Sequence, residues 1–120
     1  MKILVCGGRD YGDEKRVFDE LDALDKQWRI ELVIHGDARG ADSLAELWSR
    51  ERLRASTGRK YRVTSEEWRQ LGRKAGPLRN QRMLDEQQPD LVLAFPGDTG
   101  TADMVRRAKA GDYAVQEVPR

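Results

Sequence analysis

Three short loops that combine glycine with charged side chains are the places in this sequence best suited to chemistry. They span residues 7–10, 36–40 and 96–100, and each directly follows a short apolar run. Glycines let a backbone approach a ligand closely, and the free N–H groups at the start of a following helix attract anions. Arg9 and Arg39 add guanidinium groups, which bind phosphate oxygens in pairs. The loops therefore predict a site for a phosphate-bearing ligand.

The apolar runs before these loops indicate the strands that position them. Residues 3–6, 32–34 and 91–95 are apolar throughout, which is typical of parallel strands buried on both faces. Residues 61–64 and 113–118 alternate between apolar and polar, which predicts edge strands. In the segments between these strands, apolar residues recur at helical spacing, which predicts helices. The expected fold class is α/β, a three-layer α/β/α Rossmann-like sandwich around a mostly parallel five-stranded sheet.

Such a sheet brings the three loops to one edge. Ligands of open α/β sheets bind beyond the carboxyl ends of the strands, so we expect one pocket there. Thr101 should cap the helix after the third loop and face the anion with its hydroxyl and N–H groups. The residues expected to contact the ligand are Gly7, Gly8, Arg9, Gly36, Arg39, Gly40, Asp42, Arg79, Asn80, Gly97, Gly100 and Thr101.

Two tryptophans fall on apolar stripes at helical spacing, and a third does not. Trp28 and Trp48 lie on such stripes, so both are expected in the core. Trp68 lies in the polar and less regular segment 65–82, in which a new helix is expected only from about Leu78. Long connections in compact domains are often functional, and Trp68 is a candidate for stacking on a nucleobase.

The composition excludes several classes of protein. With 120 residues, one domain spanning residues 1–120 is expected. The single cysteine excludes an intramolecular disulfide, and no metal site is predicted from one Cys and one His. Neither a long apolar run nor a signal-peptide pattern is present, so a cytoplasmic protein without a membrane partner is expected. The glycine loops also lack the dinucleotide-binding and Walker A patterns.

Two residues that end strands at the predicted site carry chemistry of their own. His35 has no acidic partner that the sequence identifies, so we expect a hydrogen-bonded structural histidine rather than a general base. Cys6 follows a buried run, and buried thiols are usually inert, so we expect a small core residue.

Positive charge is concentrated in the middle of the chain. The formal net charge is +1, yet residues 50–82 contain eleven Lys or Arg and three Asp or Glu. Such a segment is either a phosphate or nucleic-acid face or a solvated, ion-paired surface. Binding of single-stranded DNA is a lesser alternative, because few aromatic residues are interleaved with the basic ones.

Four motifs occur in order and identify a family resemblance. They are GGRDY at 7–11, HGDARGAD at 35–42, AGPLRNQRM at 75–83 and PGDTGTADM at 96–104. Together they resemble the YspA-like (DUF2493) family of the SLOG superfamily, which also contains the LOG and DprA proteins. The resemblance implies a Rossmann-like homodimer that binds a nucleotide or nucleotide-derived small molecule. No cofactor is expected, although a divalent ion could accompany the ligand phosphate.

The LOG relatives also suggest an enzymatic alternative. They are phosphoribohydrolases, which split the N-glycosidic bond of nucleoside 5′-monophosphates, and their motif is P-G-G-x-G-T-x-x-E. In this sequence Met104 stands at the position of the catalytic glutamate, and Asp103 lies about 100° away around the helix axis. Ligand binding, as a sensor or binding module, is therefore the expected function. Hydrolysis through Asp103 or Asp42 is the alternative.

Overall fold

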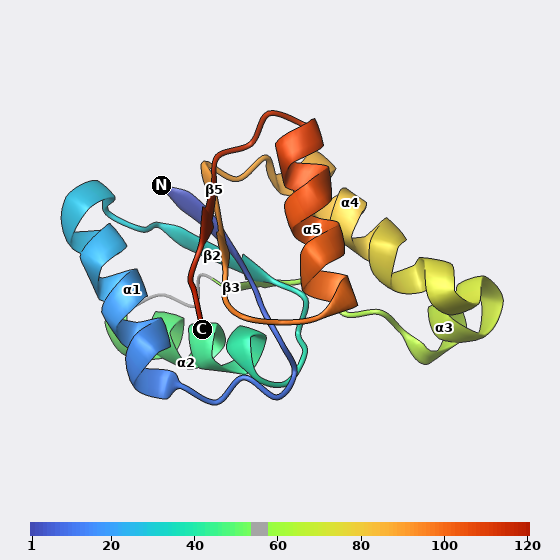
Figure 1. Ribbon diagram of the computed structural model, residues 1–120, viewed down its shortest axis with the longest axis horizontal. Coiled ribbons are helices and arrows are strands. Elements are labelled where there is room, and N and C mark those ends of the chain that lie inside the picture. The colour runs from blue at the N-terminus through green and yellow to red at the C-terminus, as the bar shows by residue number, and fades with distance from the viewer. Residues whose placement is uncertain (54–57) are drawn as a thin grey trace.

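A parallel sheet forms the centre of the computed structural model, which describes residues 1–53 and 58–120 (Figure 1). Its strands are β1 (Lys2–Cys6), β2 (Leu32–His35), β3 (Gly58–Lys60), β4 (Leu91–Ala94) and β5 (Val115–Glu117). The strand order is β3-β2-β1-β4-β5, and every neighbouring pair is parallel. The chain therefore winds outward from β1 in both directions, and the order reverses between β1 and β4. This reversal is where open α/β sheets bind ligands.

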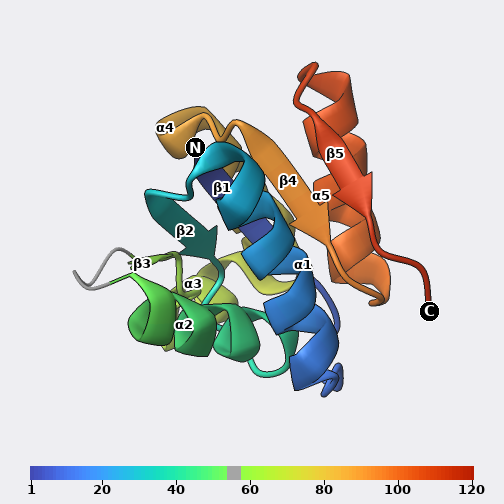
Figure 2. The same cartoon turned by 90° about the vertical axis from the view of Figure 1, so that its left-hand side faces the viewer.

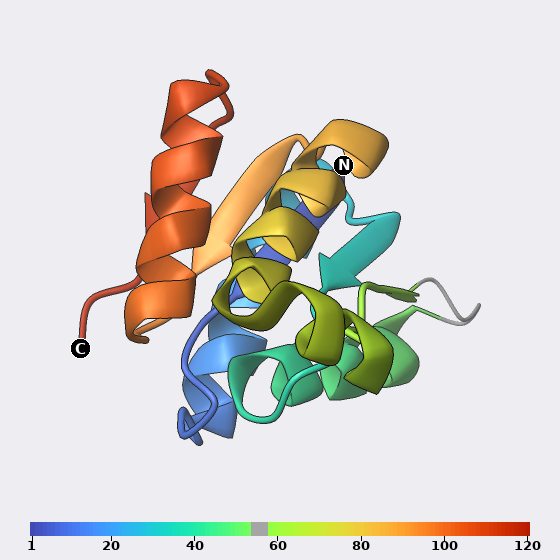
Figure 3. The same ribbon diagram turned by 90° about the vertical axis from the view of Figure 1, so that its right-hand side faces the viewer.

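Helices cover both faces of the sheet and complete the predicted three layers. The helical elements are α1 (Glu14–Trp28), α2 (Ala41–Arg52), α3 (Ser65–Leu71), the 3-10 turn η1 (Gly72–Lys74), α4 (Ala75–Gln87) and α5 (Thr99–Ala110). Helices α1 and α2 lie on one face (Figure 2), and α4 and α5 lie on the other (Figure 3). The Rossmann-like α/β fold predicted from the sequence is thus confirmed. Among the described residues, no helix combines the length and the apolar content needed to cross a membrane.

Two hydrophobic clusters, one on each face, explain the continuous apolar runs of the inner strands. In β1, Ile3 and Val5 belong to the cluster that includes α1 and α2 residues, whereas Leu4 and Cys6 belong to the cluster that includes α4 and α5 residues. Successive side chains of a strand point to opposite faces, so a strand covered on both sides needs apolar residues at every position. Trp48 is fully buried in the first cluster, as predicted.

Two of the predicted positions in the sheet and core are wrong. Trp28 is 55% exposed, because it is the last residue of α1 and its side chain lies beyond the packed stripe. The expected strand at 61–64 is also displaced, since the edge strand is Gly58–Lys60. The ring of Tyr61 instead packs into the cluster beside α4, and its carbonyl accepts a hydrogen bond from Arg79 at 3.3 Å.

The segment 65–82 is more helical than predicted. Helix α3 starts after a capping box, in which the Thr64 hydroxyl accepts from the N–H of Glu67 and the Glu67 carboxylate accepts from the N–H of Thr64. Helix α4 begins at Ala75 rather than near Leu78. Pro77 lies in the first turn of α4, where a missing N–H leaves no intrahelical bond unmade. The Gly-Pro pair is therefore part of a helix start and not a break.

Candidate functional site

A cleft of about 730 Å³ opens at the carboxyl edge of the sheet, among the loops that follow β1, β2 and β4. Its volume is within the range of roughly 300–1,000 Å³ found for small-molecule sites. Arg9 comes from the first loop, Gly36 and Ala38 from the second, and Asp98 from the third. Helices α3, α4 and α5 and the 3-10 turn η1 supply most of the remaining wall, and residues of β1 and α2 complete it.

The cleft brings together most of the residues that the sequence predicts as a site. Those that line it are Gly7, Arg9, Gly36, Asp42, Arg79, Asn80, Gly100, Thr101 and Asp103. Gly8, Arg39, Gly40 and Gly97 are not among the lining residues. The Arg39 guanidinium is 79% exposed and lies 3.9 Å from the Asp10 carboxylate. Arg9 and Arg39 thus differ in position, although both follow a buried strand in the sequence.

Three of the glycines outside the cleft hold its loops against one another. The N–H of Gly8 donates to the Pro96 carbonyl at 2.9 Å, and the Gly8 carbonyl accepts from the N–H of Ala41 at 3.3 Å. A Cβ on Gly40, whose φ is +74°, would collide with that Gly8 carbonyl. A Cβ on Gly97 would lie 2.8 Å from the nitrogen of Gly8. These three glycines shape the cleft indirectly, because they allow the backbones of its loops to pack closely against one another.

The first turn of α5 presents free N–H groups to the cleft. The helix begins at Thr99 after Asp98, and Asp98 makes no side-chain cap. Thr99, Gly100 and Thr101 all line the cleft, and the first N–H groups of a helix have no partner within it. These groups and the helix dipole favour an anion. Thr101 is the third helical residue, so the prediction that it caps the helix is wrong, because α5 starts two residues earlier.

Arg79 and Asp42 carry opposite charges and both contact Gly36, with Asp42 buried and Arg79 half-buried. Arg79 Nη1 donates to the Gly36 carbonyl at 3.1 Å, and Asp42 Oδ2 accepts from the N–H groups of Gly36 and Ala38 at 3.0 and 3.3 Å. Burial lowers the pKa of Arg79, and the charge of Asp42 opposes that effect. Burial also raises the pKa of Asp42, against the hydrogen bonds that it accepts from Ala38 and Gly36. A Cβ on Gly36 would lie 2.5 Å from Arg79 Nη1, so a larger residue there would displace the guanidinium.

Asp103 faces the cleft, whereas Met104 packs in the core. Asp103 Oδ1 accepts from Arg106 at 2.6 Å, and Oδ2 accepts from Arg107 at 2.9 Å and from Asn80 at 3.1 Å. Asn80 also donates to the Gly100 carbonyl at 3.2 Å. The buried Asn80 therefore ties α4 to the first turn of α5, and Asp103 holds Arg106 at the rim.

Trp68, the predicted stacking candidate, lies in the cleft, and so do two arginines that the sequence did not predict as contacts. Trp68 comes from α3, Arg73 from η1 and Arg106 from α5, and all three line the cleft. The capping-box pattern Thr64-x-x-Glu67 could have predicted α3 and so the placement of Trp68. The spacing of Asp103 and Arg106, three residues apart on a helix, is the signal for their ion pair.

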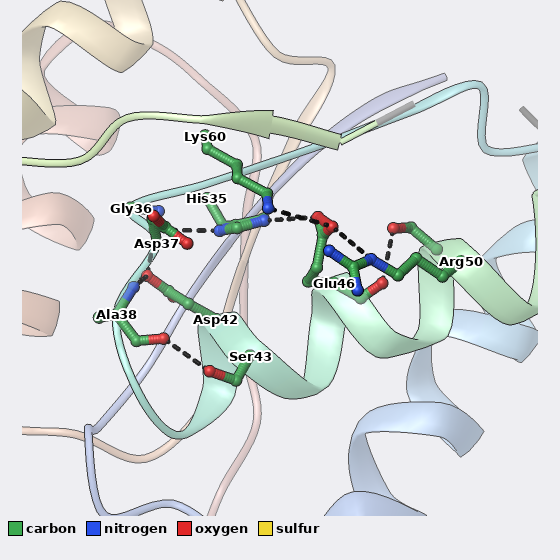
Figure 4. A network of polar contacts seen from close by, with 10 residues as sticks. His35, Gly36, Asp37, Ala38, Asp42, Ser43, Glu46, Arg50 and Lys60 are labelled. Carbon is green, nitrogen blue, oxygen red and sulfur yellow. Dashed lines mark hydrogen bonds and ion pairs between the residues drawn. The ribbon is translucent and has the colours of Figure 1, made fainter. Parts of the chain in front are cut away.

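His35 lies in a polar network behind the cleft (Figure 4). The N–H of Asp37 donates to His35 Nδ1 at 3.0 Å, so Nε2 carries the proton and donates to Glu46 Oε1 at 2.9 Å. Glu46 also accepts from Arg50 and pairs with Lys60 at 3.7 Å. Both ring nitrogens are thus occupied, as in a structural histidine, and α2 provides the acidic partner that the sequence did not identify. Although burial raises the pKa of Glu46, the His35 hydrogen bond and nearby cations outweigh it and lower that pKa.

The Glu46→Gln variant should be less stable than the wild-type protein at pH 7, by about 1–3 kcal/mol. The pKa of Glu46 is lower in the folded protein than its ordinary value of 4.5. At pH values above 4.5 the charged form of Glu46 therefore stabilises the fold. This contribution is lost as the pH falls through the folded-state pKa. In urea unfolding between pH 3 and 7, the difference in unfolding free energy between the wild-type protein and Glu46→Gln should therefore shrink below about pH 4.5. A difference that is constant over this range would contradict the assignment.

Metal and thiol chemistry find little support in the described residues. No three His, Cys, Asp or Glu side chains in residues 1–53 and 58–120 are grouped so that they could hold a metal ion. Cys6 lines the floor of the cleft, yet burial, with Asp42 and Glu117, raises its pKa to about 12. A thiol of this pKa stays protonated and unreactive at neutral pH.

Comparisons with known proteins agree with the fold and the motifs. Residues 1–57 match the model of the YspA, cpYpsA-related SLOG family. The chain is also similar to the "Gene 61 protein" of Mycobacterium phage D29, with 36% identity over an alignment of 118 residues that covers 92% of this chain and 90% of that protein. The resemblance seen in the four motifs is confirmed. The chain belongs to the YspA, cpYpsA-related SLOG family.

Proposed function

We propose that the cleft binds a nucleotide or nucleotide-derived small molecule, with its phosphate at the first turn of α5. The observation that carries this proposal is the uncapped start of α5, which faces a cleft also lined by arginines. Four guanidinium groups line the same cleft, those of Arg9, Arg73, Arg79 and Arg106. Arginine and helix N-terminal N–H groups are the donors that bind phosphate best in proteins.

Membership of the SLOG family suggests nucleotide-related binding or glycosidic-type chemistry. The geometry of the cleft supports nucleotide binding more directly than glycosidic chemistry. Arg79 Nη1 and Nε are used by backbone and Asn80 oxygens, and Nη2 makes no hydrogen bond to any described residue. This leaves a donor for a ligand on a side chain that the fold already holds in place, which is the arrangement of a preorganised binding group.

Proton NMR of mixed nucleotides tests the proposal. Nucleoside mono-, di- and cyclic monophosphates would be recorded with and without the protein. Selective line broadening identifies the bound class and supports the proposal. Spectra that stay unchanged at millimolar nucleotide would reject it. New signals of free base or ribose 5-phosphate would reveal turnover.

The buried carboxyl of Asp42 favours hydrolysis of an N-glycosidic bond as a second candidate function. Only Oδ2 accepts hydrogen bonds from described residues, and burial raises the pKa of the group. A carboxyl of raised pKa can transfer a proton near neutral pH. In such a reaction the water oxygen would bond to C1′ as the bond from C1′ to the base nitrogen breaks. Asp42 would take the proton that the water loses and pass a proton to the leaving base nitrogen. Asp103 is less suited, because cations occupy both of its oxygens.

The Asp42→Asn variant separates the two functions. If the protein is a hydrolase, release of ribose 5-phosphate should fall at least about 100-fold while nucleotide affinity changes little. The variant should also be more stable at pH 7, because it removes a charge that burial disfavours. The stability gain should vanish as the pH falls below the ordinary carboxyl pKa of 3.8, where Asp42 is protonated in both states.

Asp103→Asn is the companion variant for the activity assay. If turnover by the wild-type protein is unchanged in both variants, neither carboxylate is the proton donor or acceptor. If the unfolding midpoint of Asp42→Asn falls instead of rising, the carboxylate of Asp42 stabilises the apo protein and the burial argument is wrong.

The basic middle segment gives little support to DNA binding. Several of its side chains are paired with acids, among them Arg50 with Glu46 and Arg82 with Glu86. Its basic residues in the described part of the chain are also spread from the end of α2 to the middle of α4. These ion pairs fit the solvated surface that the sequence left open, whereas Arg73 and Arg79 of the same segment line the cleft.

A further inference from the structure

The short helix α3 carries a tryptophan into the cleft without burying it in the protein. Trp68 is 43% exposed and lines the cleft, and no residue of α3 is buried. The capping box formed by Thr64 and Glu67 holds the start of the helix instead. The indole of Trp68 therefore contributes little to the core, and an exposed indole in a cleft is suited to bind a flat ligand.

The other two tryptophans show that this placement is specific. Trp48 is fully buried and donates its indole N–H to Asp22 at 2.8 Å. Trp28 is exposed at the end of α1, on the opposite face of the sheet, and does not line the cleft. All three lie in the described residues, and Trp68 is the one that combines exposure with a place in the cleft.

The cleft has an apolar part and an anion-binding part. Pro77 and Met83 of α4 line it together with Trp68, whereas the first turn of α5 and Arg106 supply N–H groups and a guanidinium. Helices α3 and α5 lie on different sides of α4 (Figure 3). A ligand that reaches both parts needs an aromatic group at one end and an anion at the other.

We propose that the base of a nucleoside phosphate stacks on the Trp68 indole while its phosphate binds at the first turn of α5. This inference rests on the proposed function and narrows it, because it selects nucleoside phosphates over sugar phosphates that lack a base. Stacking on an indole tolerates every base, since each has a π-face. Purines should bind more tightly than pyrimidines, because the larger ring system covers more of the indole.

Titrations with three probes test this orientation. The probes are adenosine 5′-monophosphate, cytidine 5′-monophosphate and ribose 5-phosphate, which shares their phosphate but has no base. Trp68→Ala should weaken binding of adenosine monophosphate about tenfold by calorimetry and leave ribose 5-phosphate binding unchanged. The matched control Trp28→Ala, which removes another exposed indole that lies outside the cleft, should change neither. In Trp28→Phe, fluorescence of the remaining tryptophans should be quenched by the nucleotides and not by ribose 5-phosphate.

The outcomes distinguish this inference from the proposed function. Equal affinity of Trp68→Ala and wild-type protein for adenosine monophosphate would overturn the stacking role and leave nucleotide binding standing. Failure of all three probes to bind the wild-type protein would overturn both. A changed sedimentation mass for Trp68→Ala, with nucleotide affinity retained, would assign Trp68 to a contact between copies of the chain and reject the inference. Circular dichroism should show an intact fold, because Trp68 packs in neither hydrophobic cluster.

Discussion

Replacing Arg79 with methionine is expected to weaken nucleotide binding by roughly 10- to 100-fold, as loss of a hydrogen bond from a charged donor implies. Arg79 lies in the cleft wall, with Nη1 held by the carbonyls of Gly36 and Tyr61 at 3.1 and 3.3 Å. The guanidinium is therefore oriented before the ligand arrives, and little entropy is lost when it binds phosphate. Methionine keeps much of the side-chain volume but removes the charge and all donors.

Calorimetric titration with adenosine 5′-monophosphate measures this effect. Arg82→Met is the matched control, because Arg82 lies one turn along α4, pairs with Glu86 at 2.8 Å and is not among the residues that line the cleft. The control should bind as the wild-type protein does. Equal affinities for all three proteins would show that the phosphate does not use Arg79. A comparable loss in Arg82→Met would point to long-range charge rather than a direct contact.

Replacing Gly40 with alanine is expected to destabilise the protein by roughly 2–5 kcal/mol. Gly40 precedes α2 with φ +74° and ψ −127°, a conformation that L-residues with a Cβ rarely adopt. The new Cβ would also lie 2.7 Å from the backbone carbon of Arg9. Backbone atoms cannot move aside as a flexible side chain can, so the loops after β1 and β2 would have to separate.

Urea unfolding of Gly40→Ala checks this expectation, with Gly12→Ala as the control. Gly12 has no positive φ, and a Cβ there would meet nothing within 4 Å. The control should stay within about 0.5 kcal/mol of the wild-type protein. If both variants unfold at the wild-type midpoint, the contact between the two loops does not contribute to stability. Gly40→Ala should also bind nucleotide weakly, because Gly36 and Asp42 belong to the displaced loop and the helix it enters.

The strands and their loops could be predicted because their signals are local. Residues 3–6, 32–34 and 91–95 are apolar throughout, and burial on both faces needs no knowledge of the partner strands. A glycine-containing loop after each run then places the cleft at the carboxyl edge. The four motifs were sufficient to identify the family, and the similarity to known proteins bears that out.

The roles of individual charged residues could not be predicted in the same way. Arg9 and Arg39 occupy equivalent sequence positions, yet Arg9 lines the cleft and Arg39 extends into solvent beside Asp10. Asp103 faces the cleft although it stands one residue before the position that the LOG motif marks. The direction of each side chain depends on where a helix begins and on how loops cross, and a shift of one residue turns a side chain by about 100°.

The sequence alone determined the α/β class, the sheet edge that holds the loops and the family, because apolar periodicity and glycine placement act over a few residues. Only the tertiary structure decided that Asn80 ties Asp103 to the Gly100 carbonyl, that Glu46 is the acid partner of His35 and that Trp68 enters the cleft. These contacts join residues from different elements. Their geometry is set by the packing of helices on the sheet, which no local pattern of residue types records.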